Sequence, residues 1–143
     1  MAYELLDNIS RADIAYRVRG SNLVDLFING GRALVSIMLE DPESVRPTES
    51  VNFNTASPDP DLLYYDYLSE FIFYKDTHKL ILMPATVEIF HTDQGYALSC
   101  KATGEKIDRA RHVFIADIKA ITMHNLAVAF VDDEWHATVV VDV

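Results

Sequence analysis

The chain opens with alternating apolar and polar residues and then changes to helical spacing. From Ala12 to Arg19 apolar residues occupy alternate positions, which predicts a strand with one buried face. Gly20-Ser21-Asn22 ends this strand, and apolar residues then recur every three or four positions to about Glu40, as on an amphipathic helix. Glycine inside a helix costs roughly 1 kcal/mol relative to alanine. We therefore expect another backbone to approach Gly30-Gly31 closely, the alternative being a helix interruption.

A second helix is predicted after a short strand over residues 50–55. Asp59 can accept the free amides at the start of a helix, and Pro60 suits its first position. Leucine and aromatic residues then recur at helical spacing as far as Tyr74. Tyrosines and phenylalanines so close together could form a platform for stacking nucleic-acid bases. Their helical spacing favours a helix whose aromatic side faces the core.

The remaining residues have the pattern of β-strands. Strands over residues 80–92 and 96–103 are predicted to pair as a hairpin through Thr92-Asp93-Gln94-Gly95. Residues 104–112 are expected to form a crossing loop. Cys100, in the hairpin before this loop, is expected to be a small core residue.

A closing hairpin is predicted at the end of the sequence. Its first strand runs through residues 118–122, Asp132-Asp133 supplies the turn, and residues 137–141 form the return strand. The order strand, helix, strand, helix and then four or five strands predicts an α+β fold with two helices packed on largely antiparallel β-sheet. At 143 residues, the chain is expected to form a single domain over residues 1–143.

Composition narrows the kinds of partner. The net charge of −10 disfavours direct nucleic-acid binding, which depends on lysine and arginine neutralising phosphates. Such a charge suits a basic protein partner or a cation. No apolar run is long enough to span a membrane, and the first residues lack the pattern of a secretory signal. With one cysteine in the chain, we expect a cytoplasmic protein without disulfides.

Candidate chemistry centres on acidic residues at strand ends. The sequence contains no Gly-rich phosphate loop, cysteine pair or His-x-x-x-His motif. If the first and last strands are neighbours, Asp13, Asp142 and the α-carboxylate of Val143 converge on one edge. Such an oxygen-only ligand set suits Ca²⁺ or Mg²⁺, and Lys119 could offset the charge or contact a phosphate. The alternative is that both aspartates are exposed strand-end residues.

The same residues fall in motifs that resemble those of the archease family, small proteins that activate the tRNA-splicing RNA ligase. The resemblance runs nearly end to end, and its motifs follow in the family's order: Tyr3-Glu4-Leu5-Leu6, Ala12-Asp13-Ile14, Gly20-Ser21-Asn22-Leu23-Val24-Asp25-Leu26-Phe27, Tyr67-Leu68-Ser69-Glu70-Phe71, Gly104-Glu105, Asp108-Arg109-Ala110-Arg111-His112, Lys119-Ala120-Ile121-Thr122-Met123-His124 and Val141-Asp142-Val143. Ser10-Arg11 departs from the family's usual His-Thr, Met123 stands for a tyrosine and Tyr67 for a tryptophan.

The resemblance implies a function without catalysis by this chain. Asp13, Asp142 and Val143 would bind a divalent cation, usually Ca²⁺, and Lys119 beside them would be needed for activation. This assembly would promote transfer of GMP onto the ligase and support repeated turnover. Four further residues of the matched motifs are expected near the site: Glu70, Glu105, His112 and His124.

Two other functions are compatible with the sequence. The family has also been linked to tuning a tRNA-modifying enzyme, so the chain could be a chaperone or specificity modulator of a tRNA methyltransferase. It could instead be a metal-dependent phosphate-ester hydrolase that uses the same acids with His112 or His124 as base.

Overall fold

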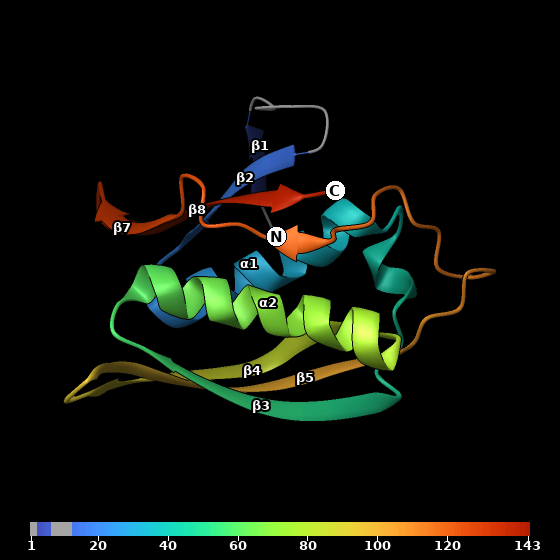
Figure 1. The fold of residues 1–143 in the computed structure, drawn as a ribbon, viewed down its shortest axis with the longest axis horizontal. Coiled ribbons are helices and arrows are strands. Elements are labelled where there is room, and N and C mark those ends of the chain that lie inside the picture. Colours follow the sequence, from blue (N-terminus) through green and yellow to red (C-terminus); the bar gives the residue numbers. More distant parts are fainter. Residues whose placement is uncertain (1–2, 7–12) are drawn as a thin grey trace.

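Two helices lie between two antiparallel β-sheets in the computed structural model, which describes residues 3–6 and 13–143 (Figure 1). The five-stranded sheet has the order β1-β2-β8-β6, with β7 also paired to β8, and the three-stranded sheet has the order β3-β5-β4. The predicted α+β fold is therefore confirmed. Along the chain the elements are β1 (Tyr3–Leu6), β2 (Asp13–Gly20), α1 (Leu23–Met38), the 3-10 helix η1 (Pro42–Ser44), β3 (Glu49–Ser57), α2 (Pro60–His78), β4 (Leu80–Thr92), β5 (Gly95–Lys106), β6 (Ala120–Ile121), β7 (Ala127–Val131) and β8 (Glu134–Asp142).

Side-chain caps set the start of both helices, at Asp59 as expected from the sequence. Asn22 precedes α1 and its side-chain oxygen accepts the Asp25 amide at 2.8 Å. Asp59 accepts the Leu62 amide at 2.9 Å in the same way, and Pro60 occupies the first position of α2. Each cap satisfies an amide that has no partner within its helix. Neither described helix is both long and apolar enough to cross a membrane.

Aromatic side chains fill the contact between the two helices. Tyr64 and Tyr67 of α2 are fully buried against Phe27 of α1, so they cannot stack on bases and that interpretation of α2 is wrong for them. The glycines of α1 make room for these rings. A Cβ on Gly30 would lie 2.7 Å from a ring carbon of Tyr64, and one on Gly31 would lie 2.8 Å from the Tyr67 hydroxyl. The close approach expected at this pair comes from side chains, not from another backbone, and α1 continues through both glycines.

The β4–β5 hairpin forms where it was predicted, but β5 is longer than expected. Thr92 pairs with Gly95 across a two-residue turn, and Gly95 has the positive φ of 127° that favours glycine. Gly104 pairs with Leu82 in β4 and with Glu49 in β3. Residues 104–106 are therefore strand, and the crossing loop begins only at Ile107, because β5 continues between its two neighbours.

The closing hairpin differs from the prediction in its first strand. Asp132 and Asp133 form the turn, with φ values of 52° and 64°, as a two-residue hairpin requires. They connect β8 to β7, whereas the predicted strand over residues 118–122 is reduced to β6. Both β6 and β7 lie along the same edge of β8. Asp61 of α2 accepts the amide of Val128 at 2.7 Å, so one outward-facing donor of β7 is already paired.

Candidate functional site

Asp13 and Asp142 face each other at one end of the five-stranded sheet. Asp13 begins β2, Asp142 ends β8, and the two are cross-strand partners in the antiparallel pair. Directly opposed side chains share a face of the sheet, with Cβ atoms about 4.5–5.5 Å apart. Both aspartates and the adjacent Val143 are half-buried. The fold thus brings two carboxylates, separated by nearly the whole chain, within reach of a single ion.

Lys119 lies on the other side of β8. Its amide donates to the carbonyl oxygen of Asp142 at 2.8 Å, and the next residue, Ala120, is the cross-strand partner of Asp142. The Lys119 side chain is exposed. Asp142 is therefore flanked by Asp13 on one neighbouring strand and by the Lys119 segment on the other.

The donors at this edge are oxygen atoms, which suit a hard divalent cation such as Ca²⁺ or Mg²⁺. Across residues 3–6 and 13–143, no group of three or more His, Cys, Asp or Glu side chains is arranged to hold a metal. Besides the two aspartates, an ion here would draw on main-chain oxygens, such as those of Val143, and on water. The Ser10-Arg11 segment, where the sequence departs from the family pattern, lies outside the described residues.

Glu70 and His124, two further residues singled out in the sequence, lie in different parts of the fold. Glu70 lies on α2, one turn after Asp66; burial, and secondly the charge of Asp66, raise the pKa of its carboxyl. His124 follows β6 and is exposed, with its amide donating to the Thr122 hydroxyl at 3.2 Å. Thr122 in turn donates to the Val140 carbonyl at 2.8 Å, which fastens the end of β6 to β8.

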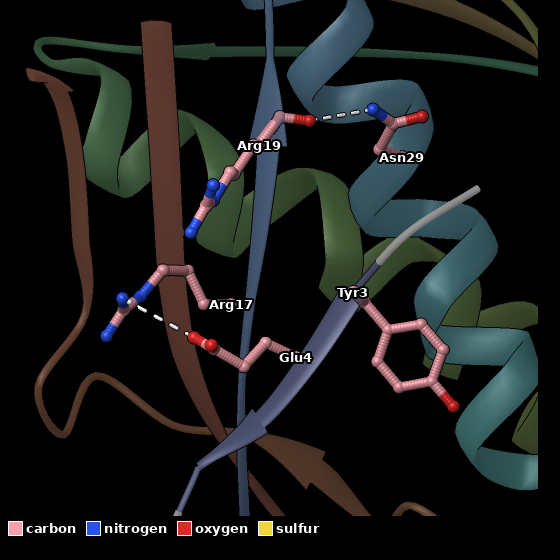
Figure 2. A pocket seen from close by; sticks show the side chains of 5 residues that line it. All are labelled: Tyr3, Glu4, Arg17, Arg19 and Asn29. Atoms are coloured by element: carbon pink, nitrogen blue, oxygen red, sulfur yellow. Dashed lines mark hydrogen bonds and ion pairs between the residues drawn. The ribbon is translucent and has the colours of Figure 1, made fainter. Parts of the chain in front are cut away.

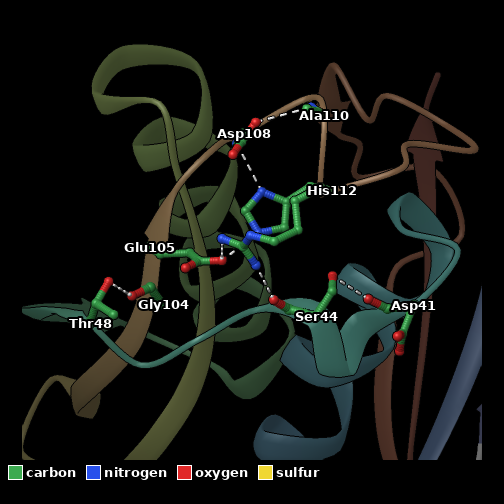
Figure 3. Close-up of polar contacts among 9 residues, drawn as sticks. Asp41, Ser44, Thr48, Gly104, Glu105, Asp108, Ala110 and His112 are labelled. Atoms are coloured by element: carbon green, nitrogen blue, oxygen red, sulfur yellow. Dashed lines mark hydrogen bonds and ion pairs between the residues drawn. The ribbon is translucent and has the colours of Figure 1, made fainter.

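Glu105 and His112 form a buried polar cluster with Arg111 (Figure 3). The Nδ1 atom of His112 accepts the amide of Asp108 at 2.9 Å, so Nε2 carries the proton and donates to Glu105 at 2.6 Å. Arg111 also binds Glu105 and donates to the Ser44 carbonyl at 2.7 Å. Both ring nitrogens of His112 are thus engaged, and the cluster fastens the loop after β5 to β5 and η1.

The ionisation of Glu105 contributes to stability. Burial acts to raise the pKa of its carboxyl, but hydrogen bonds from Arg111, His112 and the backbone at Arg46 outweigh burial and hold the pKa below the usual 4.5. A carboxyl whose pKa is lower in the folded than in the unfolded protein stabilises the fold at pH values above the unfolded-state pKa. This stabilisation is lost as the pH falls through the folded-state pKa.

We therefore expect Glu105→Gln to lower the melting temperature most above pH 4.5. The gap between the wild-type and variant melting temperatures should narrow as the pH falls below that value. Thermal unfolding followed by circular dichroism from pH 7 to pH 3 measures this gap at each pH, as unfolding of the protein is linked to proton uptake by the carboxylate. A gap that stays constant over the whole range would contradict a stabilising role for the ionised carboxylate.

A buried lysine holds the segment that leads to Lys119. Lys75 of α2 is 4% exposed, and its ammonium donates to Asp76 at 2.6 Å and to Asp117 at 2.9 Å. The sequence analysis did not identify this residue. Helical spacing could have shown that Lys75 is buried, since Leu68, Ile72 and Lys75 lie on one face of α2.

A hollow away from Asp13 is lined by residues of β1, β2 and α1 (Figure 2). Its arginines are already paired: Arg17 with Glu4 at 3.4 Å and Arg19 with Glu134 at 3.5 Å. Asn29 donates to the Arg19 carbonyl at 2.7 Å. These contacts fit a surface of mixed charge better than a basic nucleic-acid interface.

Comparison with known proteins agrees with the resemblance found in the motifs. The family model described as "Archease protein family (MTH1598/TM1083)" matches residues 3–143. Protein archease of Methanopyrus kandleri is 31% identical over 131 residues, which cover 92% of this chain and 93% of the relative. Protein archease of Thermococcus gammatolerans is 33% identical over 132 residues, 92% of each chain.

Two solved structures share the fold. The solution structure of Methanobacterium thermoautotrophicum protein 1598 has a TM-score of 0.84 and 27% identity, covering 99% of this chain and 98% of the other. The crystal structure of "an archease, possible chaperone" from Thermotoga maritima has a TM-score of 0.59 and 18% identity, covering 98% of each chain, and supports the fold alone.

Proposed function

The chain belongs to the archease family, and on that premise we propose that it is a cation-dependent protein activator of a tRNA-splicing RNA ligase. In this proposal the chain makes and breaks no covalent bond. The ligase carries out the chemistry, and the chain promotes transfer of GMP onto the ligase and its repeated turnover.

The observation that carries this proposal is the register of β8 with its two neighbours. Asp142 is opposite Asp13 in β2 and opposite Ala120 in β6, and its carbonyl accepts the Lys119 amide. Two carboxylates and the backbone of an exposed lysine are therefore neighbours at one edge of the sheet. A surface organised before its partner binds loses less entropy on binding.

Each residue at this edge has a distinct role in the proposal. Asp13, Asp142 and the main-chain oxygens of Val143 would hold the cation, with Ca²⁺ as the expected ion. When bound, the ion would supply positive charge that offsets the two carboxylates. Lys119 is then the group that would contact the nucleotide or phosphate in the ligase, because an ammonium stabilises phosphate charge without itself reacting.

The charge of the chain supports a protein partner that handles RNA. A net charge of −10 repels nucleic acid and attracts a basic protein surface. The chain would therefore bind a basic surface of the ligase, and the ligase alone would bind the tRNA.

We expect Lys119→Ala to lower the stimulated rate of ligase guanylylation by about tenfold or more, as for the loss of one charge-assisted hydrogen bond. Cation binding should persist, since Lys119 contributes only its amide to the Asp142 backbone. The assay measures incorporation of labelled GMP into the ligase with Ca²⁺ present. Lys101→Ala removes another exposed lysine, in β5, and serves as the matched control.

Full stimulation by Lys119→Ala, or no stimulation by the wild-type chain, would refute the proposal. The second candidate is the chaperone or specificity modulator of a tRNA methyltransferase that the family resemblance allows. Binding to such an enzyme should survive both Asp142→Ala and chelation of divalent ions, whereas activation of the ligase should not.

A further inference from the structure

The loop between β5 and β6 contacts α2 shortly before it reaches Lys119. The contact joins Lys75 of α2 to Asp117 of the loop. Lys75 is almost completely buried, and its two carboxylate partners are much more exposed, with side-chain exposures of 54% for Asp76 and 55% for Asp117. A buried ammonium loses its hydration and depends on anionic partners. Breaking either ion pair therefore costs the buried Lys75 ammonium more than it costs the exposed carboxylate.

We infer that Lys75 is a positioning residue, which holds Asp117 and thereby sets the place of Lys119 beside Asp142. This inference rests on the proposed function of Lys119. It adds a residue that would contact neither the cation nor the ligase, and that acts through Asp117.

Three successive residues are held in three different ways. The Asp117 carboxylate binds the Lys75 ammonium at 2.9 Å, the Ile118 side chain is fully buried in the core, and the Lys119 amide donates to the Asp142 carbonyl. The side chain of Lys119 is the first after these contacts to project into solvent. Because α2 packs against strands of both sheets, the Lys75–Asp117 contact joins the loop to the core two residues before Lys119.

The two carboxylates bound to Lys75 have different positions in the chain. Asp76 is the next residue of the same helix, so its contact with Lys75 fixes nothing outside α2. Asp117 lies 42 residues away and ties the loop to the helix. Removing either one takes one anion from the same ammonium, but only the loss of Asp117 removes a contact between α2 and the loop. The backbone amides of Ile115 and Ala116 still bind the Met38 carbonyl, so Asp117 is the last of these ties before Ile118 and Lys119.

This difference provides a matched test with Asp117→Ala and Asp76→Ala. We expect Asp117→Ala to accelerate hydrogen exchange of the Lys119 amide roughly tenfold, by local opening of its bond to Asp142. The same variant should lower stimulation of ligase guanylylation, with the dissociation constant for Ca²⁺ changed by less than about twofold, because β2 and β8 remain paired. Asp76→Ala should leave the Lys119 exchange rate and the stimulation at the wild-type level. Lys75→Met, which keeps an apolar stem without the charge, should accelerate Lys119 exchange as Asp117→Ala does.

Equal effects of Asp117→Ala and Asp76→Ala on Lys119 exchange would overturn the inference, since the ion pair would then serve only the helix. An unchanged exchange rate in Asp117→Ala would also overturn it. The exchange measurement needs no ligase, so its outcome is separate from that of the proposed function. If the wild-type chain fails to stimulate the ligase, the proposed function fails while the exchange rates still decide the positioning role.

Discussion

Replacing Asp142 with asparagine should weaken Ca²⁺ binding by at least about 100-fold, a loss of about 2.7 kcal/mol. Asp142 lies in β8 between Asp13 and Ala120, and its carboxylate is one of two that share a face at this edge. Asparagine keeps the shape of the side chain but replaces a charged carboxylate with a neutral amide oxygen, which attracts a divalent cation less strongly. Isothermal titration of Ca²⁺ into the wild-type chain and the variant measures the two dissociation constants. Asp13→Asn should have an effect of similar size.

The matched control for this experiment is Asp132→Asn in the β7–β8 turn. It removes the same charge from the same hairpin, and asparagine tolerates the positive φ of 52° found there. Ca²⁺ affinity should be unchanged in this variant. The double variant of Asp13 and Asp142 should lose little more than either single variant, because one ion depends on both residues. A wild-type affinity in Asp142→Asn, or an equal loss in Asp132→Asn, would rule out a shared site.

The second large effect is on stability, and we expect it for Gly104→Ala. Gly104 pairs with Glu49 on one side and Leu82 on the other, within the central strand of the three-stranded sheet. A Cβ at this position would collide with the Ile81 carbonyl oxygen and lie 2.9 Å from the Leu82 Cα. These are backbone atoms of a paired strand, which cannot turn aside as a flexible side chain can. The substitution should lower the free energy of unfolding by about 3 kcal/mol or more.

Chemical denaturation of the wild-type chain and Gly104→Ala measures this loss. Thr103→Ala changes the preceding residue of β5, which is half-buried, and it removes side-chain atoms without adding any. It should cost less than about 1 kcal/mol. If Gly104→Ala were as stable as Thr103→Ala, the close packing of β4 against Gly104 would be wrong.

Local signals in the sequence predicted the helices and turns well. Asn22 and Asp59 mark helix starts because a side chain can bond to an amide two or three residues ahead, a contact that needs no distant partner. The turns at Asp93-Gln94 and Asp132-Asp133 are equally local, since backbone conformation there depends on a few residues.

Pairing between distant segments was harder to predict. No local pattern indicates that the strands divide into two sheets on opposite sides of the helices, or that β6 and β7 share one edge of β8. The candidate site depends on β2 lying next to β8, a pairing of distant segments that the spacing of residues along the chain does not indicate. The Lys75–Asp117 contact joins residues 42 positions apart, and no local pattern in either segment indicates the other.

The place of β8 within its sheet has a consequence for how the protein is made. β8 lies between β2 and the β6–β7 edge, so the five-stranded sheet cannot be completed until residues 134–142 have left the ribosome. The three-stranded sheet and α2 come from residues 49–106 and can assemble earlier. Contacts between segments so far apart in sequence form late because closing long loops is entropically costly. The two aspartates therefore meet near the end of folding, and a nascent chain that stops short of β8 contains Asp13 without its cross-strand partner.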